Sequence, residues 1–516
     1  MTVTSVPVAL GPTRGRPEPA GRGPELLPLE PGQQYRFTFA MDACVGCHSC
    51  EVACAEQNAT ALDEPWRRVG EIEAGQYPTT RRFNLSMACN HCIEPTCLSG
   101  CPTNAYEKLA NGIVTHHAEE CVGCQYCIWN CPYEVPVYSA ARKVVSKCDL
   151  CKPRLEAGQE PACVLACPTR AIGVEPVDVA SWRADHAAAD APGLPPSAIT
   201  LSTTAIRVPP GLGGEVRTGD DHRVEPEDPH WPLIALTLLT QLALGAVAAT
   251  TLLDAVGTTG PAAGGAGALG GAATAAFVAG SAALSASLLH LGRPARALKA
   301  LRNLRTSWLS REVALFVAFA AASLAYAASS HLGLAHPVRL GVGVAATAAG
   351  AAGVYASARL YLVPARPVWN SLRTPVSFAA TAVAAGPLLA LLAVDRSAAP
   401  AGAVAALVAA AAAGTLLQLA CHLHLVRALR RAGDRQHRGT AELLGRLRDL
   451  VLARLGLAGL ALALLASVVP TGLDGPAAGG RLAAALLAVA AGELAGRYLF
   501  YVTVVPYRVA GSFFGR

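Results

Sequence analysis

Sixteen cysteines fall into four short runs between residues 44 and 167. The first run has the spacing C-x2-C-x2-C-x3-C, and the third run repeats it. The second, third and fourth runs each end in Cys-Pro. The runs are Cys44, Cys47, Cys50 and Cys54; Cys89, Cys92, Cys97 and Cys101; Cys121, Cys124, Cys127 and Cys131; and Cys148, Cys151, Cys163 and Cys167.

Cysteines at this spacing suit the irons of a [4Fe–4S] cube. Three thiolates on a short loop hold three irons, and in a C-x2-C-x2-C-x3-C-P run the fourth cysteine ligates the neighbouring cluster. Zinc sites use pairs of cysteines rather than triplets followed by Cys-Pro, and disulfides do not demand one spacing four times. The runs therefore predict four [4Fe–4S] clusters that pass electrons along a row. Of the 17 cysteines, only Cys421 lies outside the runs, and we expect no role for it.

The segments around the runs predict an α+β ferredoxin-like module made of two dicluster units. Residues 35–40 alternate and are rich in aromatic side chains, which predicts a strand, and residues 111–115 predict a turn and a second strand. We expect the electron-transfer domain to cover residues 35–175. The Pro- and Gly-rich residues 1–34 are expected to form a disordered tail, and residues 176–229 a linker on the surface of the module.

Apolar runs dominate the chain from Trp231 onward. Runs of about 20 residues, enough to cross a bilayer as helices, recur eight times, and their small residues suit close packing in lipid. A soluble bundle is the alternative, but the runs show little polar face. Residues 230–510 are therefore predicted to form an all-α bundle of eight transmembrane helices in the plasma membrane. The runs cover approximately 231–255, 269–291, 309–330, 338–362, 374–394, 400–426, 450–470 and 480–505.

The distribution of charge predicts an orientation. The net charge of +6 is small for 516 residues, so we expect no nucleic-acid partner. With eight spans, both ends of the bundle lie on the side of the module. Loops on that side carry sixteen cations, in 293–311, 359–373 and 427–448, against Arg339, Arg396 and Arg481 on the other side. Because cations are retained in the cytoplasm, the cluster module is predicted to be cytoplasmic.

Two ionisable residues lie where the bundle meets the module. His290 ends the second apolar run and Glu312 begins the third. Ionisable groups near a bilayer are costly and tend to be functional, and oxidation of a quinol needs a proton acceptor beside each hydroxyl. The alternatives are that Glu312 caps its helix, where a carboxylate suits the helix dipole, and that His290 is merely interfacial.

The sequence resembles two subunits of the dimethyl sulfoxide reductase family joined in one chain. Residues 35–170 resemble its four-cluster electron-transfer subunit, and residues 231–510 resemble its membrane anchor. The matching segments of the anchor are HWPLIALTLLTQLALG at 230–245, LLHLGRPARALKALRNLRTSWLSREV at 288–313 and RLYLVPARPVWNSLRTPVSF at 359–378. The resemblance implies that His290 and Glu312 bind the quinol, which is menaquinol or another quinol, with Arg293 and Arg311 beside them.

The resemblance also implies how the runs share their clusters. The order is nested, the first run with the fourth and the second with the third. The implied ligand sets are Cys44, Cys47, Cys50 and Cys167; Cys148, Cys151, Cys163 and Cys54; Cys89, Cys92, Cys97 and Cys131; and Cys121, Cys124, Cys127 and Cys101.

The implied function is a relay from membrane quinol through the four clusters to a separate molybdopterin subunit that reduces the terminal acceptor. The reverse flow, from a formate dehydrogenase-like partner into quinone, is an alternative. So is an anchor for a polysulfide, thiosulfate or tetrathionate reductase. A scaffold that passes electrons to a soluble carrier without quinone chemistry is a third. A b-type haem needs two facing histidines; the candidates are His290, His422 and His424, but the family generally lacks haem and none is expected.

Overall fold

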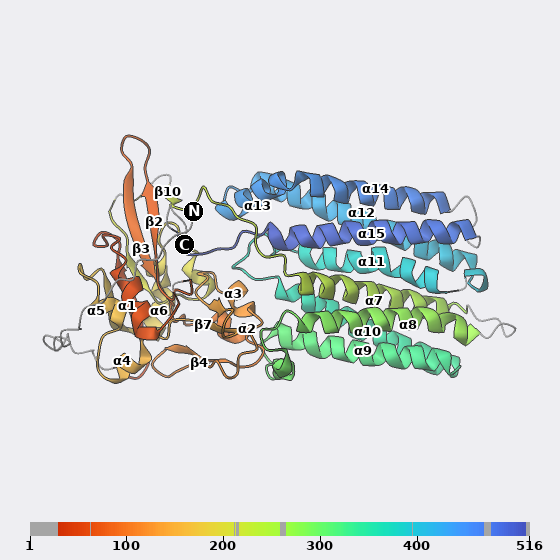
Figure 1. Ribbon diagram of the computed structural model, residues 1–516, viewed down its shortest axis with the longest axis horizontal. Helices are drawn as coiled ribbons and strands as arrows, with labels where there is room; N and C mark the ends of the chain where they lie inside the picture. Colours follow the sequence, from red (N-terminus) through yellow and green to blue (C-terminus); the bar gives the residue numbers. More distant parts are fainter. Residues whose placement is uncertain are drawn as a thin grey trace, which may run out of the picture.

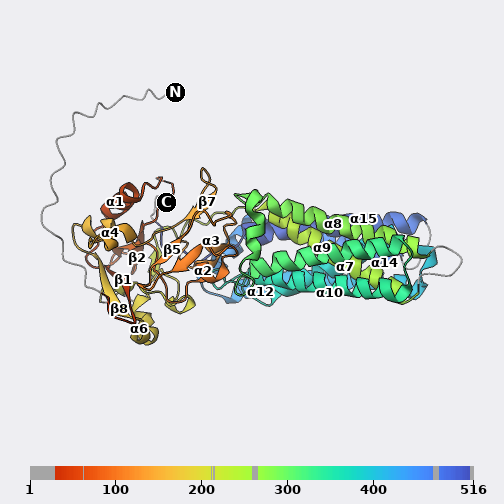
Figure 2. The ribbon, with the colours of Figure 1, turned by 90° about the horizontal axis from the view of Figure 1, so that it is seen from below.

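The computed structural model describes residues 29–61, 63–210, 212, 216–257, 265–394, 396–468 and 476–511. A cysteine-rich module and a helical bundle lie end to end along the long axis of the molecule (Figures 1 and 2). Both ends of the bundle face the module, because α7 (Trp231–Ala255) starts there and α15 (Pro476–Val502) returns there. The expected α+β module followed by an all-α bundle is confirmed. Of the expected tail, residues 1–28 lie outside the described residues.

Two three-stranded sheets and two hairpins form the framework of the described part of the module. In the first sheet, β1 (Gln33–Ala40) pairs antiparallel with β8 (Ile172–Asp178) and parallel with β9 (Ala205–Arg207). In the second sheet, β2 (Arg68–Ala74) pairs antiparallel with β3 (Arg81–Met87) and with β10 (Val216–Thr218). The hairpins join β4 (Tyr106–Lys108) to β5 (Val114–His116) and β6 (Val137–Ser139) to β7 (Val144–Ser146).

Five short helices hold the cysteine runs. They are α1 (Ser49–Asn58), α2 (Thr96–Gly100), α3 (Tyr126–Asn130), α4 (Lys152–Glu156) and α5 (Ala162–Leu165). Helix α1 packs on α5, and α2 packs on α3, so the first run lies beside the fourth and the second beside the third. Helices α2 and α3 lie next to the bundle, whereas α1, α4 and α5 lie at the far end of the module (Figure 1).

Residues 176–229, expected as a linker, are instead folded onto the module. They contain the end of β8, helix α6 (Val179–Asp185), the 3-10 turns η1 (His186–Ala189) and η2 (Ser197–Ile199), and strands β9 and β10. The hydroxyl of Thr204 donates to Oδ1 of Asn90 at 2.6 Å, and the hydroxyl of Thr200 donates to the sulfur of Cys92 at 3.1 Å. The described part of the segment therefore adds a strand to each sheet and contacts the second cysteine run.

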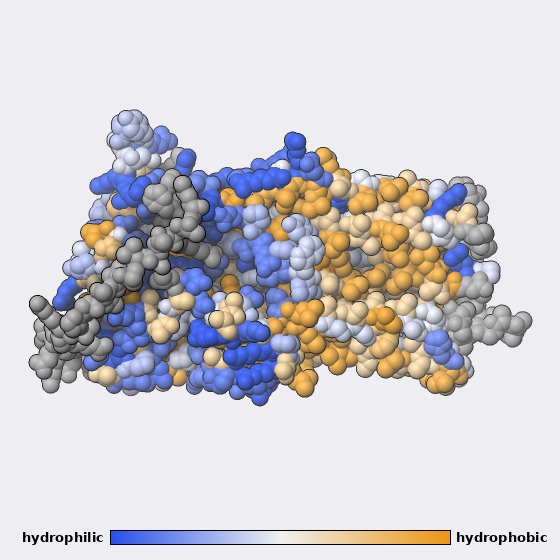
Figure 3. Space-filling view, viewed as in Figure 1, coloured by the Kyte–Doolittle hydropathy of each residue, from blue (hydrophilic) through white to orange (hydrophobic). Residues whose placement is uncertain are grey.

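Among the described residues, eight helices are long and apolar enough to cross a membrane. Besides α7 and α15 they are α8 (Gly265–Leu288), α9 (Trp308–His331), α10 (His336–Leu360), α11 (Arg373–Ala393), α12 (Ala401–Arg431) and α14 (Arg448–Val468). Apolar residues cover the visible face of the bundle, and hydrophilic residues cover the module (Figure 3). The expected eight-helix bundle is confirmed, and α13 (Arg435–Arg446) adds a short helix at the module end, where a loop was expected.

Small residues allow close contact between α7 and α11, as the composition of the bundle predicts. A Cβ atom added to Gly245 would lie 2.0 Å from the carbonyl oxygen of Ala382, and one added to Gly386 would lie 2.2 Å from the backbone of Gly245. Neither distance is physically possible, so the two helix backbones touch directly at these glycines.

The module is fastened to the bundle by hydrogen bonds and ion pairs. The hydroxyl of Tyr126 in α3 donates to the carbonyl of Leu360 at 3.1 Å. Lys299, in the 3-10 turn η3 (Pro294–Leu301), pairs with Glu120 at 2.8 Å. Because these contacts come from the third cysteine run and its approach, they place that run directly against the membrane helices.

Candidate functional site

The thiols of the first and fourth runs form two groups at the far end of the module. The first group contains Cys44, Cys47, Cys50 and Cys167, and the second group contains Cys148, Cys151, Cys163 and Cys54. Burial raises the pKa of Cys44, and the nearby thiols of Cys167 and Cys47 raise it further. Burial likewise raises the pKa of Cys54 to about 12, with added repulsion from Cys163 and Cys151. Cys54 therefore faces the cysteines of the fourth run, and Cys167 faces those of the first.

The thiols of the second and third runs also form two groups, each with one thiol from the other run. The third group contains Cys89, Cys92, Cys97 and Cys131, and the fourth group contains Cys121, Cys124, Cys127 and Cys101. Cys89, Cys92, Cys97 and Cys131 line one cavity of about 20 Å³. Burial raises the pKa of Cys92 to about 12, with added repulsion from Cys89 and Cys131. In the fourth group, burial raises the pKa of Cys124 to about 12, and Cys101 and Cys121 add to the rise.

Hydrogen bonds from the main chain reach the sulfurs of these groups. Among the described residues, no three His, Cys, Asp or Glu side chains gather closely enough to hold one metal ion. Several sulfurs accept hydrogen bonds from main-chain N–H groups, including those of Ala105 to Cys101 at 3.3 Å and Ala171 to Cys167 at 3.2 Å. Such bonds stabilise cluster thiolates and tune reduction potential. Bound iron supplies the positive charge that buried thiols need to lose their protons.

Side chains between the groups connect them into a row. Arg67 is 2% exposed and lies within electrostatic reach of thiols from the first two groups, Cys50 and Cys163 among them. Lys147 is 3% exposed and lies near Cys148 of the second group and Cys89 of the third. The order of the groups therefore runs from the far end of the module toward the bundle.

Tyr106 completes this row. It is buried between Cys97 of the third group and Cys127 of the fourth. Burial raises its pKa, and the charge of the two thiols raises it further, so the phenol is neutral. The fourth group is thus the last before the membrane, with Cys124 toward the bundle.

A cavity of about 310 Å³ lies where the third run meets the bundle. Its walls come from α3, α7, α8, η3 and α9, and both His290 and Glu312 line it. Cys124 lines the same cavity. The exposed side chains of Leu298 and Val317, also in its wall, leave an apolar opening on the outer surface of the bundle.

His290 is fixed against the loop of the third run. The carbonyl of Cys124 lies 3.1 Å from Nε2 of His290. The next residues pair by their backbones, since the N–H of Arg293 donates to the carbonyl of Val122 at 3.0 Å. A Cβ atom at Gly292 would lie 2.4 Å from the carbonyl oxygen of Lys143, so only glycine allows this approach.

This hydrogen bond determines which nitrogen of His290 can accept a proton. A carbonyl oxygen only accepts, so Nε2 carries the hydrogen and Nδ1 of the neutral ring is the acceptor. Burial lowers the pKa of His290, which keeps the ring neutral near pH 7. Glu312, 3% exposed, supplies a carboxylate to the same cavity. Together they offer two acceptors for the protons of a two-proton donor.

The two arginines expected beside this pair lie outside the cavity wall. The guanidinium of Arg293 donates to the carbonyls of Ala118 at 2.8 Å and Arg142 at 3.3 Å, and so holds the module. Arg311 lies over the ring of Trp308 at 4.5 Å and donates to the carbonyl of Leu304 at 2.9 Å. The structure therefore brings together His290 and Glu312 but not Arg293 and Arg311.

Sequence reasoning missed two rings beside the cavity. Trp129 of α3 lines it, and the ring centroid of His230 lies 5.1 Å from that of Trp129 and 5.4 Å from that of His290. Burial lowers the pKa of His230 to about 4, and His290 lowers it further. The position of His230 just before an apolar run was the available signal, but its neighbours depend on how the module docks.

A group of aromatic residues from the 361–369 loop supports the cavity from the other side. Tyr361 lines the cavity, and its hydroxyl is hydrogen-bonded to that of Tyr501. The guanidinium of Arg366 lies over the rings of Trp369 at 4.9 Å and Trp129 at 5.7 Å. Of these three loop residues, Tyr361 lines the cavity, and Arg366 and Trp369 pack behind it.

The haem candidates are distributed over different parts of the bundle. His290 lies in the cavity beside Cys124, whereas His422 lies on α12 and lines a second cavity. His424 is an exposed residue of the same helix.

Two protein families match this chain. The 4Fe-4S dicluster domain family matches residues 81–176, and the DMSO reductase anchor subunit (DmsC) family matches residues 227–502. The module is similar to the B subunit of the anaerobic dimethyl sulfoxide reductase of Haemophilus influenzae, with 37% identity over 184 residues, which are 34% of this chain and 89% of that protein. The B subunit of the Escherichia coli reductase is 34% identical over 182 residues, 34% of this chain and 88% of that protein.

A relative with another name is also similar to this chain. The formate dehydrogenase iron-sulfur subunit of Haemophilus influenzae is 34% identical over 212 residues, which are 37% of this chain and 66% of that protein. The module is therefore similar to electron-transfer subunits of more than one kind of complex, whereas the family matched by the bundle is that of the reductase anchor.

Proposed function

Because this protein belongs to the family of dimethyl sulfoxide reductase anchor subunits and carries the iron–sulfur subunit in the same polypeptide, we propose that it oxidises a quinol in the cavity beside Cys124. The protein is an electron-transfer subunit and multi-pass membrane anchor, and its partner is a molybdopterin subunit. Electrons from the quinol would reach that partner through four [4Fe–4S] clusters held by the four groups of thiols.

One observation carries this proposal: His290, Glu312 and Cys124 line one cavity. The apolar opening at Leu298 and Val317 suits an isoprenoid tail arriving from the lipid. The polar end, with Nδ1 of His290 and the carboxylate of Glu312, suits the two hydroxyls of the head group. A [4Fe–4S] cluster in each thiol group supplies a one-electron carrier. The protein itself would bind the quinol and take its protons at His290 and Glu312.

Each part of the module then has an assigned place. The thiol group of Cys124 receives electrons, since it adjoins the cavity, and that of Cys47 delivers them, since Cys47 is exposed at the far end. The molybdopterin partner is accordingly expected at the end of the module that carries α1, α4 and α5 (Figure 1).

The experiment that tests this function uses the purified complex without its terminal acceptor. A soluble menaquinol analogue, added anaerobically to the oxidised complex, should form quinone and reduce the iron–sulfur clusters, as followed by their visible absorption and electron paramagnetic resonance. A complex that dithionite reduces fully and the quinol leaves oxidised would exclude quinol oxidation and favour a scaffold that serves a soluble carrier.

The similarity to a formate dehydrogenase subunit favours a second candidate, the reverse flow into quinone. The cavity serves either direction, because His290 and Glu312 can return protons as well as take them. The large subunit that co-purifies decides between them. If it contains molybdenum and reduces an S-oxide or N-oxide with quinol, the forward direction holds, whereas quinone-dependent oxidation of formate would establish the reverse.

A further inference from the structure

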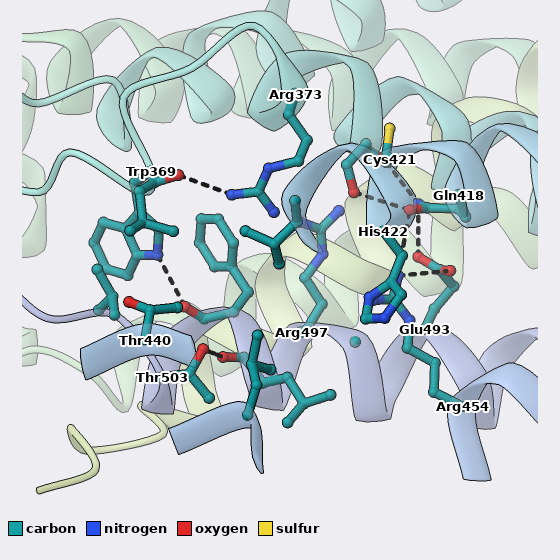
Figure 4. Close-up of a pocket in the computed structure, with 18 residues that line it drawn as sticks. Trp369, Arg373, Gln418, Cys421, His422, Thr440, Arg454, Glu493, Arg497 and Thr503 are labelled. Atoms are coloured by element: carbon teal, nitrogen blue, oxygen red, sulfur yellow. Dashed lines mark hydrogen bonds and ion pairs between the residues drawn. The ribbon is translucent and has the colours of Figure 1, made fainter. Parts of the chain in front are cut away.

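A second polar cavity lies in the other half of the bundle, between α11, α12, α13, α14 and α15 (Figure 4). Its volume is about 50 Å³. Thr440 of α13 lines it, so it lies toward the module end of the bundle, near the expected level of lipid head groups. Neither His290 nor Glu312 touches it, and the quinol function gives it no role.

This cavity carries more positive than negative charge. Arg373, Arg454 and Arg497 line it from three helices, and Glu493 is the carboxylate among the lining residues. Oε2 of Glu493 already accepts hydrogen bonds from Thr381 at 2.6 Å and from Gln418 at 2.8 Å. Its Oε1 lies 4.0 Å from Arg454. Three guanidiniums against one carboxylate leave an excess of two positive charges.

The guanidiniums converge on the same space. Figure 4 shows those of Arg373 and Arg497 pointing toward one another into the cavity. Arg373 lies within electrostatic reach of Arg454, and both act on His422. Like charges converge at a buried site only when something compensates them, since an unpaired buried charge is costly.

Arg497 keeps one buried donor without a partner. It is 3% exposed, and its Nε is buried without a hydrogen-bond partner, whereas Nη2 donates to Gln241 at 2.7 Å and to Thr381 at 3.2 Å, and the guanidinium lies over the ring of Phe378 at 3.8 Å. Arg373 uses Nη2 to reach the carbonyl of Val368 at 2.8 Å. Each guanidinium has five N–H donors in a planar fork that matches phosphate oxygens.

The cavity continues into an apolar groove. A neighbouring space shares Gln418, His422, Arg454 and Glu493 with it and is otherwise lined largely by apolar residues of α12, α14 and α15, such as Leu419, Leu455 and Val489. Only 17% of the apolar stretch of α14 is buried, so this helix borders lipid. A cationic head site joined to an apolar groove matches an amphiphile with an anionic head.

We propose that this cavity binds the phosphate of an anionic phospholipid, whose acyl chain lies in the groove between α12 and α14. Basic pockets between transmembrane helices are known to bind such head groups. A free phosphate would satisfy the arginines but leave the groove empty. A neutral quinone would fill the groove but leave the two excess charges uncompensated.

The test starts from the detergent-purified complex after lipid extraction. We expect about one phosphatidylglycerol per complex to survive mild washing, measured by lipid mass spectrometry. Added phosphatidylglycerol should raise the midpoint of thermal unfolding, whereas equal phosphatidylcholine or millimolar inorganic phosphate should not. Equal shifts with phosphatidylcholine, or with inorganic phosphate, would overturn the proposal, as would recovery of a stoichiometric quinone from this cavity in place of the lipid.

Two glycines of α15 provide a matched pair of variants that keep every charge. A Cβ atom at Gly496 would lie 2.7 Å from Cζ of Arg454, so Gly496→Ala pushes this flexible side chain away. At Gly492, one turn earlier, the nearest atom is Cβ of Leu457 at 3.6 Å, an ordinary contact. We expect Gly496→Ala to weaken phosphatidylglycerol binding at least tenfold and Gly492→Ala to change it less than twofold. Equal binding by both variants would contradict the proposal.

A charge variant gives an independent measurement. Arg373→Gln with Arg454→Gln should abolish retention of the lipid, while Arg427→Gln with Arg430→Gln, two cations at the end of α12 that do not line the cavity, should leave it unchanged. If both double variants lose the lipid equally, the retention comes from general surface charge and the cavity is not its site.

Discussion

The imidazole of His290 donates from Nε2 to the main-chain carbonyl of Cys124, across 3.1 Å. This bond joins the membrane bundle to the third cysteine run of the module. It places the proposed proton acceptor of the cavity against the backbone of a residue that belongs to the fourth thiol group. In the proposed function, proton uptake and electron uptake would thereby occur at the same place, which is what oxidation of a quinol requires.

The first prediction concerns Glu312 and His290 as proton acceptors in the cavity. Glu312→Gln removes a proton acceptor from the cavity, so quinol-driven turnover should fall by about 10²- to 10⁴-fold, the usual range for general base catalysis. His290→Gln should do the same. Both enzymes should retain turnover driven by a reduced viologen dye, which delivers electrons directly to the clusters. The two rates are measured on the same membranes.

Arg311→Gln is the matched control for this experiment. It is adjacent to Glu312 but lies over Trp308, outside the cavity wall. We expect quinol-driven turnover within about twofold of the native rate, because an exposed arginine of this kind contributes little beyond its local contacts. A loss of quinol turnover in Arg311→Gln alone, with Glu312→Gln fully active, would place the site elsewhere.

The second prediction concerns iron. The native protein should hold about sixteen irons as four [4Fe–4S] clusters. Cys47→Ser should lose about four of them, because one thiolate of its group is removed. Cys421→Ser, the same exchange in a buried cysteine of α12, should lose none. Iron analysis and electron paramagnetic resonance after anaerobic purification measure both. A native protein that contains zinc and no iron would contradict the assignment of every run.

The cysteine runs were predictable because cluster binding depends on local spacing. Three thiols on one loop, as in Cys121, Cys124 and Cys127, need no knowledge of the rest of the fold. The same holds for the membrane spans, since about 20 apolar residues in sequence suffice to cross the bilayer. His290 and Glu312 were predicted as site residues from their places at span ends and from the resemblance, not from any pattern of their own.

The remaining features depend on contacts between distant segments. Trp129 faces the cavity only because α3 docks on the bundle, and His230 matters only because it packs on Trp129. The expected linker proved to be part of both sheets, since the pairing of β9 with β1 is set by the fold and leaves no signal in a short Pro- and Gly-rich sequence. The cavity around Arg497 gathers residues from five helices and could not be predicted for the same reason.

The third prediction concerns the junction at Asp220. Its carboxylate is 5% exposed and pairs with Arg508 at 2.7 Å and Arg435 at 3.2 Å. Asp220→Asn removes the carboxylate charge that pairs with both arginines. It should destabilise the docked C-terminal segment by about 1–3 kcal/mol, less than the loss of one partner from a fully buried ion pair costs. Amide exchange around residue 508 should accelerate by roughly 5- to 100-fold. Asp221→Asn, a more exposed partner of Arg435, should change it less.

The pH dependence of this junction follows from the same pair. Burial alone would raise the pKa of Asp220, but Arg508 and Arg435 hold it below its ordinary value of 3.8. A depressed carboxyl pKa stabilises the fold above that ordinary value and loses this contribution as the pH falls through the folded value. The difference in stability between the native and Asp220→Asn proteins should thus be constant from about pH 5 to 8. A difference that vanished at about pH 6 would exclude this ion pair as its cause.

The fourth prediction is the orientation of the chain. The sixteen cations near the module predict a cytoplasmic module, although several of them also bind the module, as Lys299 binds Glu120. A protease site inserted at Gly333, a turn residue with open space around it at the opposite end of the bundle, should be cut in intact spheroplasts while the module stays whole. Removal of the module with protection of the Gly333 site would reverse the orientation.

The fifth prediction concerns the buried charge of Lys147. Its ammonium donates to the carbonyl of Cys148 at 2.9 Å and also to that of Val114. Burial alone would lower the pKa of Lys147, but the thiolates of Cys89, Cys97 and Cys148 raise it above its ordinary value. Lys147 is therefore a fixed positive charge between the second and third thiol groups. An electron added to a cluster in either group would lie close to this charge.

Lys147→Met keeps the length of the side chain and removes this charge. A nearby cation favours the reduced, more negative form of a cluster, so its loss should lower the midpoint potential of a neighbouring cluster. At an effective dielectric constant of about 20 and a separation of about 7 Å, the loss is roughly 2 kcal/mol, or about 100 mV for one electron. Lys143→Met, the same change at an exposed position on the same hairpin, should shift it by less than about 20 mV because solvent screens that charge. Redox titration followed by electron paramagnetic resonance measures both. Equal potentials in the native and Lys147→Met proteins would show that this lysine acts through its hydrogen bonds alone.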